Sequence, residues 1–178
     1  MTEKLIRSLS SVLRRSIPKA DGFFMPAEWH PHACVLMLWP ERAENWKEQA
    51  KPARIAFANV IKAIAEFENV VVGVSTPGWD SASEHLGNYP GVTMKSMEYD
   101  DIWMRDSGPT FLINEKEQLG GIAWDFNCWG MIGGSIGGMY YNVPYEKDKL
   151  VSRAVLESSE AAAVYCTEGY VLCYSVCF

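Results

Sequence analysis

Residues 51–75, KPARIAFANVIKAIAEFENVVVGVS, decide the fold, because a helical pattern leads directly into a strand pattern. Four apolar residues of this stretch recur at helical spacing, namely Phe57, Val60, Ile61 and Ile64. We therefore expect a helix over 51–68 that packs one face against a sheet. Asn69 ends this helix, and the β-branched residues that follow make 70–75 a short buried strand.

The same kind of alternation continues on both sides of this stretch. Upstream, the apolar run from Cys34 to Trp39 is closed by Pro40, which predicts a buried strand. Downstream the sequence predicts a short helix, a strand, a hairpin, a helix and a terminal strand, at 81–86, 92–97, 110–114 with 121–127, 146–158 and 170–178. The helix over 146–158 should turn four residues inward, namely Leu150, Val151, Ala154 and Val155. This order predicts an α/β or α+β fold with mixed sheets, and not a doubly wound Rossmann sheet.

The first 20 residues carry five basic residues and one acid, with apolar residues at helical spacing. This pattern predicts a basic amphipathic helix. Two interpretations stay open: a helix that covers the edge of the domain, or a mitochondrial or plastid transit peptide, which is Arg- and Ser-rich and poor in acids. Residues 1–22 are therefore treated as an N-terminal extension.

Composition excludes several classes of function. The 178 residues are 48% hydrophobic and 21% charged, as in a globular protein of one domain. With 22 acidic against 16 basic residues and no Lys/Arg cluster, a nucleic-acid partner is not expected. No apolar stretch approaches the ~20 residues that cross a bilayer, so no membrane partner is expected either. Five irregularly spaced cysteines are typical of reduced thiols and favour a cytoplasmic protein.

The segment EYDDIWMRDSGP, residues 98–109, holds the densest group of polar and aromatic residues. It lies between two predicted strands and should form a loop. Carboxylates accept paired N–H bonds from a guanidinium, and an indole face stacks on such a planar cation. The segment therefore suits recognition of a planar cation. The alternative is a solvated acidic turn with an internal ion pair of Arg105.

Other segments give weaker signals. The aromatic segment 23–32 contains Glu28, Trp29 and two of the three histidines, and its aromatic residues favour the wall of a cleft over a metal site. The glycine-rich run 130–138 matches neither a phosphate loop nor a dinucleotide fingerprint, and Cys173 and Cys177 favour a structural origin over a redox pair. The seven tryptophans, several in polar or Gly-rich surroundings, also indicate a binding cleft.

Four segments, in this order along the chain, carry a family resemblance: MPAEW (25–29), WPER (39–42) with Trp46, DIWMRDSGPT (101–110) and DFNCWG (125–130). Residues 23–172 resemble agmatine deiminases, which belong to the peptidylarginine-deiminase-type branch of the guanidine-modifying enzymes. The resemblance implies part of a five-bladed α/β propeller built of ββαβ units, with about two blades in this chain. It also implies a hydrolase that converts agmatine to N-carbamoylputrescine and ammonia in putrescine biosynthesis, a step of polyamine metabolism, without a cofactor.

The resemblance assigns roles to residues of this chain. Asp106 is expected to clamp the substrate guanidinium, and Trp103 to form the wall beside it. Asp101, Glu28 and Trp29 are expected to contribute to substrate binding. In such enzymes a cysteine thiolate attacks the guanidinium carbon and a histidine acts as acid and base.

The sequence also departs from the family pattern. Neither the glycine-flanked nucleophilic cysteine nor the Gly-His-x-Asp segment of the family occurs here. We therefore expect an N-terminal part of an agmatine deiminase, inactive by itself, that ends in a divergent tail over 173–178. Two alternatives stay open: a non-catalytic fragment that pairs with full-length subunits, and a relative of the amidinotransferase type. A homo-oligomer is also possible.

Overall fold

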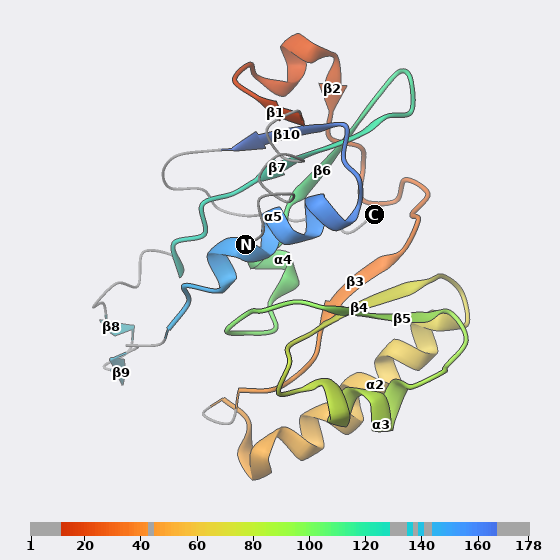
Figure 1. Cartoon of the computed structure of the whole chain (residues 1–178), viewed down its shortest axis with the longest axis vertical. Helices are drawn as coiled ribbons and strands as arrows, with labels where there is room; N and C mark the ends of the chain where they lie inside the picture. The colour runs from red at the N-terminus through yellow and green to blue at the C-terminus, as the bar shows by residue number, and fades with distance from the viewer. Residues whose placement is uncertain (1–11, 43–44, 129–134, 137–138, 141–143, 167–178) are drawn as a thin grey trace.

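The computed structural model describes residues 12–42, 45–128, 135–136, 139–140 and 144–166. Within them the chain forms a three-stranded sheet, a five-stranded sheet and a short hairpin of β8 (Ser135–Ile136) with β9 (Met139–Tyr140) (Figure 1). The observed α/β architecture with mixed sheets confirms the predicted fold class.

The three-stranded sheet is parallel and has the order β3 (Val35–Leu38), β4 (Val70–Val74), β5 (Val92–Ser96). Its strands are joined by α2 (Lys51–Ala65) and α3 (Trp79–Leu86), which lie together on one face of the sheet (Figure 1). Short parallel strands need such helical crossovers, since a tight turn cannot return the chain to the same edge. Because the strands are parallel, all three carboxyl ends meet at one edge of the sheet.

The five-stranded sheet has the order β1 (Leu13–Arg14), β10 (Ala163–Cys166), β7 (Leu119–Ala123), β6 (Thr110–Asn114), β2 (Phe23–Phe24). The antiparallel β6–β7 hairpin turns at Asn114, whose Oδ1 accepts the N–H groups of Lys116 and Gln118, each at 3.0 Å. The helix α5 (Asp148–Ser158) then returns the chain, so that β10 pairs parallel with β7. Elements β6, β7, α5 and β10 therefore make one ββαβ unit.

Two apolar clusters join these layers. One lies between the parallel sheet and its two helices and contains Trp39, Ile61 and the three buried valines of β4. The other extends from Leu38 of β3 to residues of α5, β6, β7 and β10. It also includes Tyr99, Ile102 and Met104, so the segment after β5 is part of the core that connects the two sheets.

Most predicted elements between 34 and 158 are present within a few residues of their expected bounds, but several expectations are wrong. The predicted N-terminal helix is absent from residues 13–21, which form β1 and the 3-10 helix η1 (Pro18–Asp21). Strand β1 pairs with β10, and the Asp21 carboxylate accepts a 2.9 Å hydrogen bond from the Tyr165 hydroxyl, so this segment belongs to the edge of the sheet. Residues 1–11 and the terminal strand expected at 170–178 lie outside the described part.

The predicted inward faces of the two longer helices are partly wrong as well. Val60 and Leu150 are half exposed, and Ala58 and Leu156 are buried instead. Both corrections shift the buried face by a fraction of a turn, which the spacing of the apolar residues does not determine. Trp39 is completely buried, and its indole N–H donates to the Ser81 hydroxyl at 2.9 Å, so this tryptophan belongs to the core and not to a cleft.

Gly121 on β7 allows α5 to approach the sheet closely. A Cβ atom at this position would lie 2.2 Å from Cδ2 of Leu156, which is buried. We predict that Gly121→Ala destabilises the chain by about 1–3 kcal/mol through overpacking. Leu156→Ala alone should cost about 2–5 kcal/mol.

The double variant tests this explanation. Leu156→Ala removes the atoms that collide with the new Cβ, so the double variant should lose less free energy of unfolding than the two single variants together. Urea denaturation of the four proteins measures this difference. Strictly additive losses would show that Gly121 is not needed for close packing of α5.

Candidate functional site

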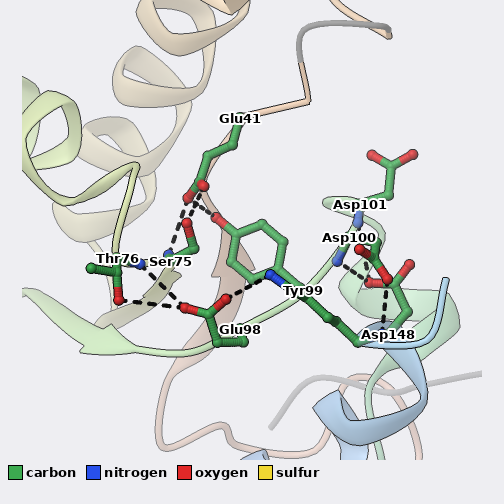
Figure 2. Close-up of polar contacts among 9 residues, drawn as sticks. Glu41, Ser75, Thr76, Glu98, Tyr99, Asp100, Asp101 and Asp148 are labelled. Carbon is green, nitrogen blue, oxygen red and sulfur yellow. Dashed lines mark hydrogen bonds and ion pairs between the residues drawn. The ribbon is translucent and has the colours of Figure 1, made fainter. Parts of the chain in front are cut away.

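The candidate site is the segment from Glu98 to Pro109, which follows β5 and leads into β6. Its start is held at the carboxyl edge of the parallel sheet (Figure 2). The Tyr99 hydroxyl faces two acceptors, the Trp39 carbonyl oxygen at 2.7 Å and the Glu41 carboxylate. The same carboxylate accepts the Ser75 N–H at 3.1 Å and the Ser75 hydroxyl. One side chain thus joins the segments that follow β3, β4 and β5.

A glycine at position 78 makes room for the Glu41 carboxylate. A Cβ at Gly78 would lie 2.2 Å from the Glu41 carboxylate, so the glycine lets the carboxylate reach Ser75. Burial, followed by the Glu41 hydrogen bond and its negative charge, raises the pKa of Tyr99 far above its usual value. Tyr99 therefore stays a neutral donor to Glu41 throughout the physiological pH range.

A second contact holds the next residues of the segment to α5 (Figure 2). Asp148, the first residue of α5, is 4% exposed, and its Oδ1 accepts the N–H groups of Asp100 at 2.7 Å and Asp101 at 3.1 Å. In return, Oδ2 of Asp100 accepts the N–H of Lys147 at 2.8 Å. An exposed ion pair of 2.8 Å between Lys147 and Glu98 joins the same two segments.

Buried and exposed residues then alternate along the segment. Ile102 and Met104 are each 6% exposed and belong to the core. Trp103, between them, is 52% exposed, and Arg105 is exposed too. The apolar residues therefore fix the backbone while their neighbours remain accessible to a ligand.

Asp106 lies on the one-turn helix α4 (Met104–Ser107), which contacts α5 and β3. The Trp103 carbonyl oxygen accepts the N–H groups of Asp106 at 2.9 Å and Ser107 at 3.0 Å, so Trp103 and Asp106 share one turn. Gly108 closes this turn, because its N–H donates to the Met104 carbonyl oxygen at 2.8 Å and a Cβ would approach that oxygen to 2.4 Å. The expected loop thus contains a short helix.

The Asp106 carboxylate is partly buried and has no hydrogen-bond partner among the residues that the structure describes. Burial raises its pKa, and the positive charge of Arg105 opposes this shift only in part. Arg105 itself forms an ion pair with Glu28 at 2.9 Å. A partly desolvated carboxylate that accepts no hydrogen bond from the described residues is suited to receive a cation from outside them.

The other predicted site residues are arranged differently. The Asp101 carboxylate accepts hydrogen bonds from the Ile102 N–H at 2.8 Å and from Asn45 at 2.5 Å, and pairs with Arg42 at 3.5 Å. Glu28 is joined to the Asp106 turn through Arg105. Trp29 is 88% exposed. The structure thus brings Trp103, Asp106, Arg105 and Glu28 together, whereas the Asp101 carboxylate is already occupied within the chain.

The described residues contain no group of three or more His, Cys, Asp and Glu side chains that could hold a metal ion. None of their helices is long and apolar enough to span a bilayer. Cys128 lies near Asp148, Arg42 and Asp101, and its pKa is raised, first by burial and then by the Asp148 carboxylate. A thiol in such surroundings is poorly suited to be the nucleophile.

Three residues of this site were not predicted from the sequence: Glu41, Ser75 and Asp148. Glu41 stands in one of the segments that carried the resemblance, but no local pattern shows that it meets Tyr99, 58 residues away. Asp148 resembles an ordinary acid at a helix N-terminus, where it is favoured by the helix dipole. Only the packing of α5 on the segment after β5 reveals its second role.

Asp148 gives a pH prediction. Burial, opposed by its two backbone hydrogen bonds, raises its pKa to about 6. For an acid whose pKa is raised in the folded state, the stabilising contribution is complete at low pH and is lost as the pH rises through the folded pKa. Asp148→Asn removes this titration but keeps the acceptor oxygen. The free energy of unfolding of the variant, relative to that of the unchanged chain, should therefore be about 1 kcal/mol higher at pH 7 than at pH 5.

Urea denaturation of both proteins at these two pH values measures the gain. Asp80→Asn, at an exposed position of α3, is the matched control and should show no such change. A constant difference between the chain and Asp148→Asn across this range would contradict the raised pKa.

Comparison with known proteins places this geometry in a family. Residues 24–172 match the family described as Porphyromonas-type peptidyl-arginine deiminase. The agmatine deiminase of Pseudomonas fluorescens (strain SBW25) is 46% identical over 157 residues, which cover 88% of this chain and 41% of the relative. That of Pseudomonas aeruginosa (strain LESB58) is 47% identical over 159 residues, with the same coverage.

Solved structures agree with the sequence matches. The structure described as agmatine deiminase of Enterococcus faecalis catalyzing its reaction superposes with a TM-score of 0.77 at 39% identity. The match covers 88% of this chain and 41% of that one, so this chain spans about two fifths of the length of these relatives. The family match covers most of the chain and includes the whole candidate site, and the chain therefore belongs to the Porphyromonas-type peptidyl-arginine deiminase family.

Proposed function

We propose that this chain supplies the Asp106 side of a guanidinium site, and that the whole protein hydrolyses agmatine to N-carbamoylputrescine and ammonia. The observation that carries this proposal is the Asp106 carboxylate, partly buried and without a hydrogen-bond partner among the described residues. Relatives named agmatine deiminases at 46–47% identity support the choice of substrate. The names of the relatives favour a deiminase over an amidinotransferase.

The proposed chemistry begins with charge complementarity. A guanidinium beside Asp106 lowers the pKa of that carboxyl again, so cation binding and ionisation of Asp106 favour each other. The half-exposed indole of Trp103, on the same turn, offers a face for stacking on the planar cation. Held in this way, the guanidinium carbon can be attacked by a thiolate, with loss of ammonia and hydrolysis of the covalent intermediate by water.

The attacking thiolate is expected from outside the described residues. Among the described cysteines, Cys128 is affected by the charges of Asp148, Arg42 and Asp101, and its raised pKa disfavours the thiolate. The 178-residue chain alone is therefore proposed to be inactive. A propeller with about two blades in this chain is part of the same proposal, and the β6–β7–α5–β10 unit supports it because it has the expected ββαβ order.

Several further assignments remain predictions. We propose that residues 1–22 form an N-terminal extension and that the family-like part ends at residue 172. We also propose that the protein is cytoplasmic and forms a homo-oligomer. A transit peptide over residues 1–20 would include β1, whose loss would leave β10 as an edge strand paired only with β7. The alternative of a pairing fragment relied on a sheet edge at 170–178, which lies outside the described residues.

The function is tested in a chimeric enzyme, in which residues 1–172 replace the matching part of the Pseudomonas fluorescens relative. This protein should release ammonia and N-carbamoylputrescine from agmatine. Asp106→Asn should lower kcat/KM about 100-fold or more, roughly 3 kcal/mol, because the clamp loses its charge. Trp103→Ala should mainly raise KM, since stacking contributes to binding.

Asp80→Asn, which removes an exposed carboxylate from α3, is the control and should leave both constants unchanged. Near-normal turnover by Asp106→Asn would refute the role of Asp106. Ammonia release by the 178-residue chain alone, abolished by thiol alkylation, would refute its proposed inactivity.

A further inference from the structure

Asp148 is not part of the proposed guanidinium contact, yet it is the most deeply buried carboxylate among the described residues around the site, at 4% exposure. Its Oδ1 accepts the N–H groups of Asp100 and Asp101, which lie 48 and 47 residues earlier in the chain. An acid at this position of a helix commonly serves its own helix terminus. Here both hydrogen bonds of Oδ1 go to the segment that carries Asp106.

This contact is reciprocal. Asp100 Oδ2 accepts the Lys147 N–H at 2.8 Å, so each segment supplies a carboxylate to the backbone of the other. Loss of the Asp148 acceptor would leave two partly buried N–H groups unpaired, which costs more than loss of an exposed bond. Loss of the exposed Lys147–Glu98 ion pair would cost little.

The contact also determines where the Asp106 turn can lie. Asp101 is followed at once by the buried Ile102, and α4 begins at Met104 and packs against α5 itself. Helix α5 therefore holds both the start of the segment, through Asp148, and the turn with Trp103 and Asp106, through packing. If residues 100–101 moved away from α5, the turn with Asp106 would shift relative to α5 and β3, which it contacts.

We propose that Asp148 is a positioning residue for the guanidinium site, which acts by holding the backbone of Asp100 and Asp101 against α5 and so fixes the turn that carries Asp106. This inference rests on the proposed function for its meaning in catalysis, but the structural step can be tested without substrate.

Amide hydrogen exchange of the full 178-residue chain tests that step. In Asp148→Ala the amides of residues 100–107 should exchange at least 10-fold faster than in the unchanged chain, while those of β4 stay protected. Asp148→Asn keeps the acceptor oxygen and should restore slow exchange. Lys147→Met, which removes only the exposed ion pair, is the matched control and should match the unchanged chain.

Two results would overturn the proposal: unchanged exchange at 100–107 in Asp148→Ala, or a faster exchange that Asp148→Asn does not restore. If Asp148→Ala does not fold, Asp100→Ala tests the same contact from the other side at a less buried position. The amides of residues 100–102 and Lys147 should then exchange at least threefold faster, and unchanged rates would count against the proposal.

Kinetics in the chimeric enzyme separate this inference from the proposed function. Asp148→Ala should lower kcat/KM for agmatine at least 10-fold, and Asp148→Asn should recover most of it. If the chimeric enzyme does not act on agmatine at all, the proposed function fails, whereas the exchange rates still decide the role of Asp148. If the enzyme is active and Asp148→Ala leaves kcat/KM unchanged, the positioning role fails alone.

Discussion

The structure depends on one partly buried carboxylate, that of Glu41. Parallel strands bring the ends of β3, β4 and β5 to one edge, but three chain segments leaving one edge need a common partner. Glu41 is that partner, because it accepts hydrogen bonds from the Tyr99 hydroxyl and from both the N–H and the hydroxyl of Ser75. Hydrogen bonds to a charged acceptor are stronger than those between neutral groups. The segment that carries Asp106 starts from this point.

From Tyr99 onward, the segment combines rigidity with accessibility. Its apolar residues are buried in the core shared by the two sheets, and its backbone at residues 100–101 is bonded to Asp148 of α5. Trp103 and Asp106 remain partly accessible within this frame. A binding site built on backbone fixed by burial needs little reorganisation when a cation arrives, which is what selective recognition requires.

The fold could be predicted from sequence where local patterns carry the information. The helix and strand within residues 51–75 follow from apolar spacing and β-branched residues, and both were found close to the predicted bounds. Two-residue strands such as β1 have too few residues for a pattern, so the helix predicted over the basic N-terminal segment was wrong for residues 13–21, the part of it that forms β1 and η1. The rotation of α2 and α5, which exposes Val60 and Leu150, depends on which sheet lies beside each helix.

For the candidate site, too, residues selected by local sequence differ from residues whose partners are distant in the chain. Trp103 and Asp106 are three positions apart in the sequence and share one turn, so residue chemistry and family resemblance selected them together. Asp101 was selected for the same reason, but its carboxylate is used by Arg42 and Asn45, which lie about 60 residues earlier in the chain. Glu41 and Asp148 could not be selected, because their partners are brought to them only by the packed sheets and α5.

If Glu41 organises the edge where the three parallel strands end, Glu41 and Tyr99 must stabilise the chain as a pair. A double-mutant cycle with Glu41→Gln and Tyr99→Phe in the 178-residue chain, followed by urea denaturation, measures the coupling free energy between them directly. We predict a coupling of about 1–3 kcal/mol, because either single change already removes the charged acceptor or its donor. Free-energy losses that add to within about 0.5 kcal/mol would contradict it.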